Sequence, residues 1–207
     1  MDILLKKGTI YYIIGEGEKA RKTLEECITL AMTWDITEHM LADAYIYAGQ
    51  ALILLNAWKE AKKAFEKAIE VSLRLKYKEG LAEAHRGIGY VNWRLGIYDL
   101  AKEEYEKALQ FAKEAGNTRI KAITYIDLGN LAGDQGRYDE AIDFYNQSIP
   151  LLKEINDMYE MARAHNNIGD TYREMGKPEK AVEHFHKGYE YATKIKAIRL
   201  QGILLHN

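Results

Sequence analysis

Cysteine and proline are scarce in this sequence. The single cysteine, Cys27, excludes an internal disulfide framework and a zinc cluster built from cysteines. Only two prolines, Pro150 and Pro178, occur in 207 residues, so long helices are rarely interrupted. No long stretch alternates between apolar and polar residues with the period of two that marks a strand. Because 47% of the residues are hydrophobic, the chain can still build a core, and we expect it to be all-α.

An excess of one charge and a long apolar run are also missing. The 29 basic and 31 acidic residues give a net charge of −2, which argues against nucleic acid or an anionic membrane as a partner. The most apolar run, residues 44–58, is too short to cross a bilayer. The first residues lack the basic leader and cleavage site of a secretory signal. We therefore expect a soluble, cytoplasmic protein.

The chain repeats itself at a step of forty residues. A glycine recurs in four copies, and each glycine is followed by an alanine, then by an aromatic residue, then by a small residue. These four columns are Gly49, Gly89, Gly129 and Gly169; Ala61, Ala101, Ala141 and Ala181; Phe65, Tyr105, Tyr145 and Phe185; and Ala68, Ala108, Ser148 and Gly188. A degenerate first copy fits at a step of forty-one, with Leu4, Gly8, Gly15, Ala20, Leu24 and Cys27. A period of this length is typical of a solenoid.

Each copy predicts two helices joined by a short turn, for example residues 42–55 and 58–75. The turn column contains Asn56, Gly96, Gly136 and Gly176. Glycine and asparagine readily adopt the left-handed conformation that ends a helix. The glycine and alanine columns let the two helices cross closely, and the aromatic column fills the space between successive pairs. Because one pair cannot bury its apolar faces alone, neighbouring pairs must stack.

These columns resemble the tetratricopeptide repeat from Met1 to about residue 200. The period is longer than the commonest one of about thirty-four residues. It is similar to the longer-helix variety of kinesin light chains, Pins-type polarity adaptors and bacterial peptide-receptor regulators. The resemblance implies an all-α, right-handed superhelical α-solenoid of about five helix–turn–helix repeats. One domain is expected over residues 1–207, with repeats near 1–41, 42–81, 82–121, 122–161 and 162–201 and then the start of a further helix.

The resemblance also implies that the first helix of each pair lines a concave face. Positions opposite the glycine column vary between copies, whereas the packing columns do not. We predict that these positions form a peptide-binding groove, which contains Tyr47, Gln50, Arg86, Tyr90, Trp93, Asp127, Asn130, Arg163, Asn166, Asn167, Asp170 and Arg173. The groove is expected to be apolar near Trp93 and polar near Asn167. An alternative of equal weight is that Tyr90 and Trp93 only pack against the neighbouring repeat.

Asn167 alone matches the asparagine that holds the peptide backbone in the kinesin-light-chain and Pins-type relatives. Asp127, Gly87 and Tyr47 stand at the equivalent positions of the other copies. Ile126 replaces the lysine of the carboxylate clamp found in chaperone-binding members, so a co-chaperone role is disfavoured.

No residue pattern indicates catalysis, a metal or a cofactor. His184 and His186 are two residues apart on a predicted helix and therefore point to different sides. Cys27 lies in the small-residue column, where a buried, inert thiol is expected. Residues 15–20 lack the lysine followed by serine or threonine that a phosphate-binding loop requires. We expect a protein without enzymatic activity.

Both ends of the array are apolar. Ile3, Leu4, Ile10 and Ile14 are expected to present apolar area at the start. Gly202 begins a sixth first helix, to which Leu204 and Leu205 belong. A longer array, a segment that folds back as a cap, and a homodimer through the terminal helices each account for these ends.

The leading hypothesis is a protein–protein interaction scaffold that binds a peptide or helix in its concave groove. One alternative is a peptide-responsive regulatory sensor module of a larger protein. The other is a self-associating structural oligomer.

Overall fold

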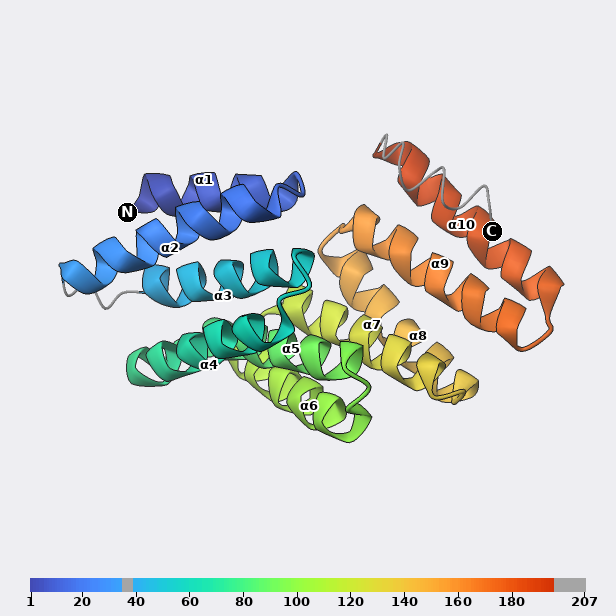
Figure 1. Ribbon diagram of the computed structural model, residues 1–207. Coiled ribbons are helices and arrows are strands. Elements are labelled where there is room, and N and C mark those ends of the chain that lie inside the picture. The colour runs from blue at the N-terminus through green and yellow to red at the C-terminus, as the bar shows by residue number, and fades with distance from the viewer. Residues whose placement is uncertain (35–38, 196–207) are drawn as a thin grey trace. The chain divides into compact units, whose positions relative to one another are not determined.

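The structure is a computed structural model that describes residues 1–34 and 39–195. These residues form ten α-helices and no strand, which confirms the all-α prediction (Figure 1). In the first half of the chain the helices are α1 (Asp2–Ile13), α2 (Gly17–Thr33), α3 (His39–Leu54), α4 (Trp58–Leu75), α5 (Lys78–Arg94) and α6 (Tyr98–Ala115). They are followed by α7 (Thr118–Asp134), α8 (Tyr138–Glu154), α9 (Met158–Glu174) and α10 (Pro178–Lys194).

The chain divides into two compact units. The first unit is Met1–Gly116 and contains α1–α6, and the second begins at Asn117 and contains α7–α10. The expectation of one continuous domain stays a prediction. From α3 onward the first helix of each pair begins at residue 39, 78, 118 or 158, before the predicted repeat boundaries at 42, 82, 122 and 162. The alignment columns locate helix crossings, and helix ends depend on the capping residues instead.

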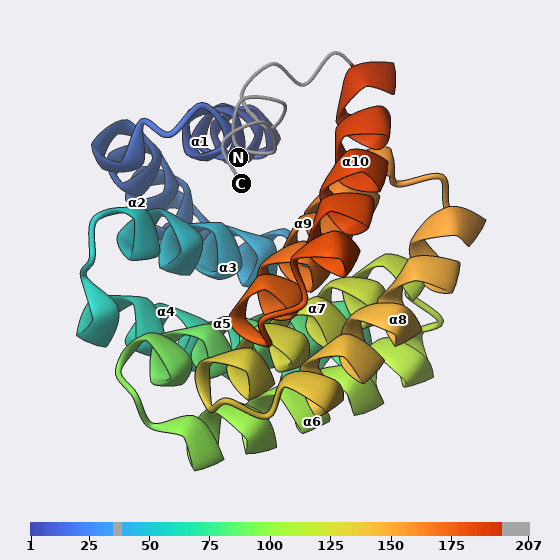
Figure 2. The same cartoon turned by 90° about the vertical axis from the view of Figure 1, so that its right-hand side faces the viewer.

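Consecutive helices pack as antiparallel pairs, as Figures 1 and 2 show for α3 with α4 and for α9 with α10. In each pair from α3 onward the glycine of the first helix faces the aromatic ring of the second, and in the first pair Gly8 faces Leu24. A Cβ atom added at Gly49 would lie 2.7 Å from the Phe65 ring, and one added at Gly169 would lie 2.5 Å from the Phe185 ring. Such distances are shorter than any van der Waals contact. The glycine column therefore allows the close helix crossing that the sequence predicted.

Left-handed backbone conformations end the first helices, as predicted at Asn56, Gly96, Gly136 and Gly176. The second helices use the same device, because φ is also positive at Lys76, Gly116 and Asn156. The backbone N–H of Ala57 donates to the carbonyl of Leu52 at 2.9 Å. This bond pairs one of the carbonyl groups that a helix leaves open at its end.

Successive pairs stack through a second set of small and apolar residues. In the first unit, Ala61, Phe65 and Ala68 of α4 pack with Ala84, Ile88 and Val91 of α5. Ala20 and Leu24 of α2 pack in the same way with Ala48 and Ala51 of α3. In the second unit, Ala141 and Tyr145 of α8 pack with Ala164 and Ile168 of α9. This stacking makes each unit a segment of a helical-repeat solenoid.

The two chain ends differ in what the structure describes. Gly202, Leu204 and Leu205 lie outside the described residues. At the start, Ile3, Ile10 and Ile14 are exposed, as predicted, and Leu4 is half-buried. None of the described helices has the length and apolarity needed to span a membrane.

Candidate functional site

In the first unit, the predicted groove residues lie on α3 and α5 and are half-buried. Tyr90 and Trp93 contact each other edge to face, with ring centroids 5.4 Å apart. The guanidinium of Arg94 lies 5.9 Å from the Trp93 ring centroid and 5.8 Å from that of Trp58. Aromatic rings and an arginine held in this way form a surface that suits apolar or planar side chains. We call Trp58, Tyr90, Trp93 and Arg94 the aromatic cluster.

Two of the other predicted residues of this unit, Tyr47 and Arg86, have partners nearby. The rings of Tyr47 and Tyr12 are 6.3 Å apart, so Tyr47 joins α3 to α1. Arg86 pairs with Glu83 one helical turn earlier, with 2.8 Å between Nη2 and Oε2. Gln50 is half-buried on α3. The aromatic cluster is therefore the part of this surface in which several side chains contact one another.

In the second unit, Asn130 of α7 and Asn167 of α9 form a hydrogen bond between the first helices of two successive pairs. The Nδ2 of Asn167 donates to the Oδ1 of Asn130 at 2.8 Å, and the hydroxyl of Tyr145 donates to the same oxygen at 2.9 Å. Burial raises the pKa of Tyr145 well above its usual range, so this hydroxyl stays protonated and remains a donor. The two donors fix the orientation of the Asn130 amide. We call Asn130 and Asn167 the asparagine pair.

Asp170 organises the polar residues beside the asparagine pair. It accepts a hydrogen bond from Asn166 at 2.9 Å and pairs with Arg173 at 2.8 Å. Burial raises the pKa of Asp170, while the positive charge of Arg173 opposes that rise. Asn166, Asp170 and Arg173 thus form one chain of contacts along α9.

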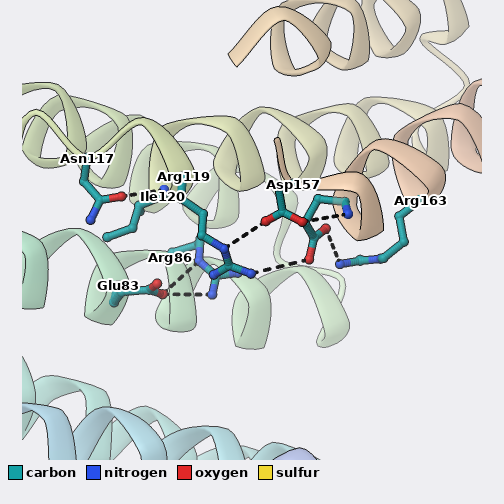
Figure 3. Close-up of polar contacts among 8 residues, drawn as sticks. Glu83, Arg86, Asn117, Arg119, Ile120, Asp157 and Arg163 are labelled. Carbon is teal, nitrogen blue, oxygen red and sulfur yellow. Dashed lines mark hydrogen bonds and ion pairs between the residues drawn. The ribbon is translucent and has the colours of Figure 1, made fainter. Parts of the chain in front are cut away.

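Arg163 is held by a network of charges that the sequence did not predict. Its Nη1 lies 2.7 Å from the Oε2 of Glu160, a nearly fully buried carboxylate. Arg119 of α7 approaches the same network and pairs with Asp157 at 3.0 Å (Figure 3). Burial raises the pKa of Glu160, and the charges of Arg163 and Arg119 oppose that rise. The network ties the start of α9 to the start of α7.

Asp127, another predicted groove residue, is buried.

A sequence signal for part of this network exists. Asp157 is the N-cap of α9 and accepts from the backbone N–H of Glu160, which is three residues later. An acidic or hydroxyl residue followed three positions later by glutamate is the pattern of a capping box. This pattern predicts the contact between Asp157 and Glu160. The contact of Arg119 with Asp157 depends instead on the packing of α7 beside α9.

Two histidines of the second unit, His165 and His184, contact each other. The Nδ1 atoms of His165 and His184 are 3.2 Å apart, and the His165 ring stacks on Tyr191. His165 is buried. Within residues 1–34 and 39–195, no cluster of three histidine, cysteine or carboxylate groups is placed to hold a metal. Cys27 is also buried, and its burial raises the pKa of the thiol.

Three solved structures illustrate what the fold resembles. The Rap conjugation gene regulator of plasmid pLS20, in complex with the Phr* peptide, is 17% identical with a TM-score of 0.85, over 97% of this chain and 55% of that one. Aspartyl phosphate phosphatase F from Bacillus subtilis is 18% identical with a TM-score of 0.82, over 97% and 52%. The kinesin light chain of Podosopora anserina, with nearly identical TPR-like repeats, is 12% identical with a TM-score of 0.68, over 95% and 96%.

These likenesses concern the fold, because every identity is low. The chain spans about half the length of the first two proteins. A comparison with curated protein sequences finds no match.

The sequence itself matches family models. One model of the tetratricopeptide repeat matches residues 80–154, and a second matches residues 2–31 and 162–194. The matched residues include helices from both units and contain the glycine, alanine and aromatic residues of three of the four helix crossings described by the columns. The chain therefore belongs to the tetratricopeptide-repeat proteins.

Proposed function

We propose that the protein is a non-enzymatic interaction scaffold that holds an extended peptide of a partner protein by its main chain. The observation that carries the proposal is the asparagine pair. The Oδ1 of Asn130 receives two donors, so its orientation is set before any ligand arrives. Preorganised polar groups of this kind lower the cost of binding.

The asparagine pair leaves a donor and an acceptor available. Among the described residues, neither the Nδ2 of Asn130 nor the Oδ1 of Asn167 has a hydrogen-bond partner, and both side chains are half-buried. An amide nitrogen can donate to a peptide carbonyl, and an amide oxygen can accept from a peptide N–H. The pair therefore matches the two main-chain groups of one extended residue, independent of its side chain.

Residues outside the asparagine pair would recognise the side chains of a ligand. Arg173 carries a positive charge that is half-exposed beside the pair, although Asp170 already binds it. The aromatic cluster of the first unit is a separate surface, which suits an apolar side chain. The Rap conjugation gene regulator of pLS20 is in complex with the Phr* peptide, which supports a peptide as the type of ligand.

A peptide library tests the proposal. The purified protein is used to select 8- to 12-residue peptides from a random display library, and isothermal titration gives their affinities. Asn167→Ala is expected to weaken the selected peptides by roughly 5- to 30-fold, because it removes a hydrogen bond and leaves a peptide group unpaired. Asn146→Ala, on the exposed side of α8, is the matched control and leaves the affinity unchanged. Failure to select any peptide, or equal affinities for wild type and Asn167→Ala, contradicts the proposal.

A peptide-responsive sensor module is a second candidate function. Because the chain spans about half of the Rap chain, it would also suit a peptide-responsive sensor module within a larger assembly. Small-angle scattering with and without the selected peptide separates the two. A sensor changes its radius of gyration when the peptide binds, and a passive scaffold does not. A cytoplasmic location and the absence of nucleic-acid partners remain parts of this proposal.

A further inference from the structure

The first helix is apolar on two opposite sides. Its inner side, with Leu5, Tyr11 and Tyr12, packs against α2 and α3. On its outer side, Ile3 is 79% exposed, Ile10 57% and Ile14 62%. A helix that is hydrophobic all round is normally buried. Isoleucine also has a lower helix propensity than the long polar residues that usually occupy an exposed helix face. The outer side of α1 therefore needs its own explanation.

In later repeats, the equivalent side of the first helix packs against the preceding helix. Ile3, Lys7 and Ile10 align with Ala84, Ile88 and Val91 of α5, which pack against Ala61, Phe65 and Ala68 of the preceding helix α4. The same positions of α9 include Ala164 and Ile168, which pack against the preceding helix α8. In α1 these positions are open, and Figure 1 shows α1 at the edge of the first unit, beyond α2 and α3.

The charge on this side selects among possible occupants. Lys7 lies between Ile3 and Ile10 and has no carboxylate partner among the described residues. Lys6, its neighbour, is paired with Asp2 at 2.7 Å. A second copy packed antiparallel on α1 would bring the two Lys7 side chains within about one helical turn of each other, and like charges at that spacing repel. A helix that carries a carboxylate is complementary instead.

We propose that the outer side of α1 is a docking surface for an amphipathic helix of a partner protein. This helix presents a small, an aromatic and a small residue at positions i, i+4 and i+7, as the second helices of the array do, and an acidic residue that faces Lys7. The docked helix extends the array by one helical layer. This surface is separate from the asparagine pair and does not depend on peptide binding there.

The chain supplies two matched probes for this surface. A peptide with the sequence of α6 has five acidic and three basic residues, and one with the sequence of α4 has three acidic and five basic residues. Both are 18 residues long and carry the alanine–aromatic–alanine pattern. Fluorescence anisotropy of each labelled, helix-stapled peptide, titrated with the full chain, measures binding. The α6 peptide is expected to bind about three-fold more tightly than the α4 peptide at low salt. That difference is expected to disappear near 0.5 M salt.

Variants of exposed residues locate the binding. Ile10→Asp is expected to weaken the α6 peptide by about ten-fold or more, because an apolar contact is lost. Ile13→Asp is the control, since Ile13 is 72% exposed but aligns with Leu54 and Arg94, which are exposed in their own helices. Lys7→Glu reverses the preference between the two peptides. Absence of binding, or equal losses for Ile10→Asp and Ile13→Asp, overturns the proposal. So does a wild-type dimer in sedimentation velocity that Ile10→Asp dissociates, because the occupant is then a second copy.

Discussion

At the scale of single residues, three equivalent positions end the second helices in the left-handed conformation. Gly116 adopts it without cost, but Lys76, with φ of 53°, does not. The left-handed conformation costs a residue with a Cβ atom roughly 1–2 kcal/mol. The array therefore stores a small strain at Lys76 that glycine would relieve.

We predict that Lys76→Gly stabilises the protein by about 0.5–1 kcal/mol, after the entropy cost of glycine in the unfolded chain is subtracted. The converse change, Gly116→Ala, destabilises by about 1 kcal/mol. No atom lies within 4 Å of an added Cβ at Gly116, so only the backbone conformation contributes. Urea denaturation with an unchanged m-value is the measurement. A loss of stability in Lys76→Gly refutes the strain.

His165 links stability to pH. Burial, together with the nearby His184 and Lys187, lowers the pKa of His165 to about 4. An unfolded histidine has a pKa of about 6.5. Because the folded state disfavours the proton, the contribution of His165 to stability is complete above pH 6.5 and is lost as the pH falls toward 4. The total loss is up to roughly 3 kcal/mol.

We therefore predict that His165→Phe reduces the loss of stability between pH 7 and pH 4.5 by about 1–2 kcal/mol. Phenylalanine can keep the stacking on Tyr191 without a titrating group. Denaturation midpoints of wild type and variant at both pH values give the difference. His186→Ala, an exposed histidine, serves as the control and behaves as wild type. Identical pH dependence in wild type and His165→Phe contradicts the assignment.

At the scale of helices, the fold depends on close crossings between the two helices of each pair. Substitutions at two glycines of α7, Gly129 and Gly133, distinguish the effect of the close crossing from the effect of helix propensity. A Cβ atom added at Gly129 would overlap the ring of Tyr145, whereas one added at Gly133 would have no neighbour closer than 4.0 Å. The same substitution should thus have opposite effects one helical turn apart.

We predict that Gly129→Ala destabilises the protein by about 1–3 kcal/mol through overpacking. Gly133→Ala stabilises it by about 0.5–1 kcal/mol, because alanine favours the helix. Thermal unfolding followed by circular dichroism measures both. Stabilisation by Gly129→Ala would show that α7 and α8 do not cross as described.

The start of α9 depends on Asp157. This residue caps the helix and pairs with Arg119. We predict that Asp157→Ala costs about 1–2 kcal/mol. Asp139→Ala, in the exposed first turn of α8, changes stability by less than about 0.5 kcal/mol. Chemical denaturation compares the two, and equal costs would show that the cap contributes nothing specific.

Helix pairing was predictable from the sequence because it repeats. Gly129 and Tyr145 are fixed by a crossing that every copy shares, and the repetition makes such positions visible. The asparagine pair was only half predictable: both residues were expected in the groove, but their contact depends on how α7 and α9 lie side by side. The contact of Arg119 with Asp157 could not be predicted, since long charged side chains reach across helices in ways that spacing does not specify.

At the scale of the whole molecule, we propose a repeat scaffold that presents preorganised polar groups to the main chain of a peptide. The aromatic cluster and the asparagine pair lie in different units. Each is complete within its own unit, so main-chain binding and side-chain selection are separable functions. Trp93→Ala should then leave the contribution of Asn167 to peptide affinity unchanged.

The most direct measurement is a thermodynamic cycle between the protein and the backbone of its peptide. Each amide of a selected peptide is replaced in turn by an ester, which removes one N–H, and affinities are measured with wild type and with Asn167→Ala. The account predicts one ester that weakens binding to wild type by about 5-fold or more but has no effect on Asn167→Ala. If every ester weakens both proteins equally, Asn167 does not hold the peptide main chain, and the central claim is wrong.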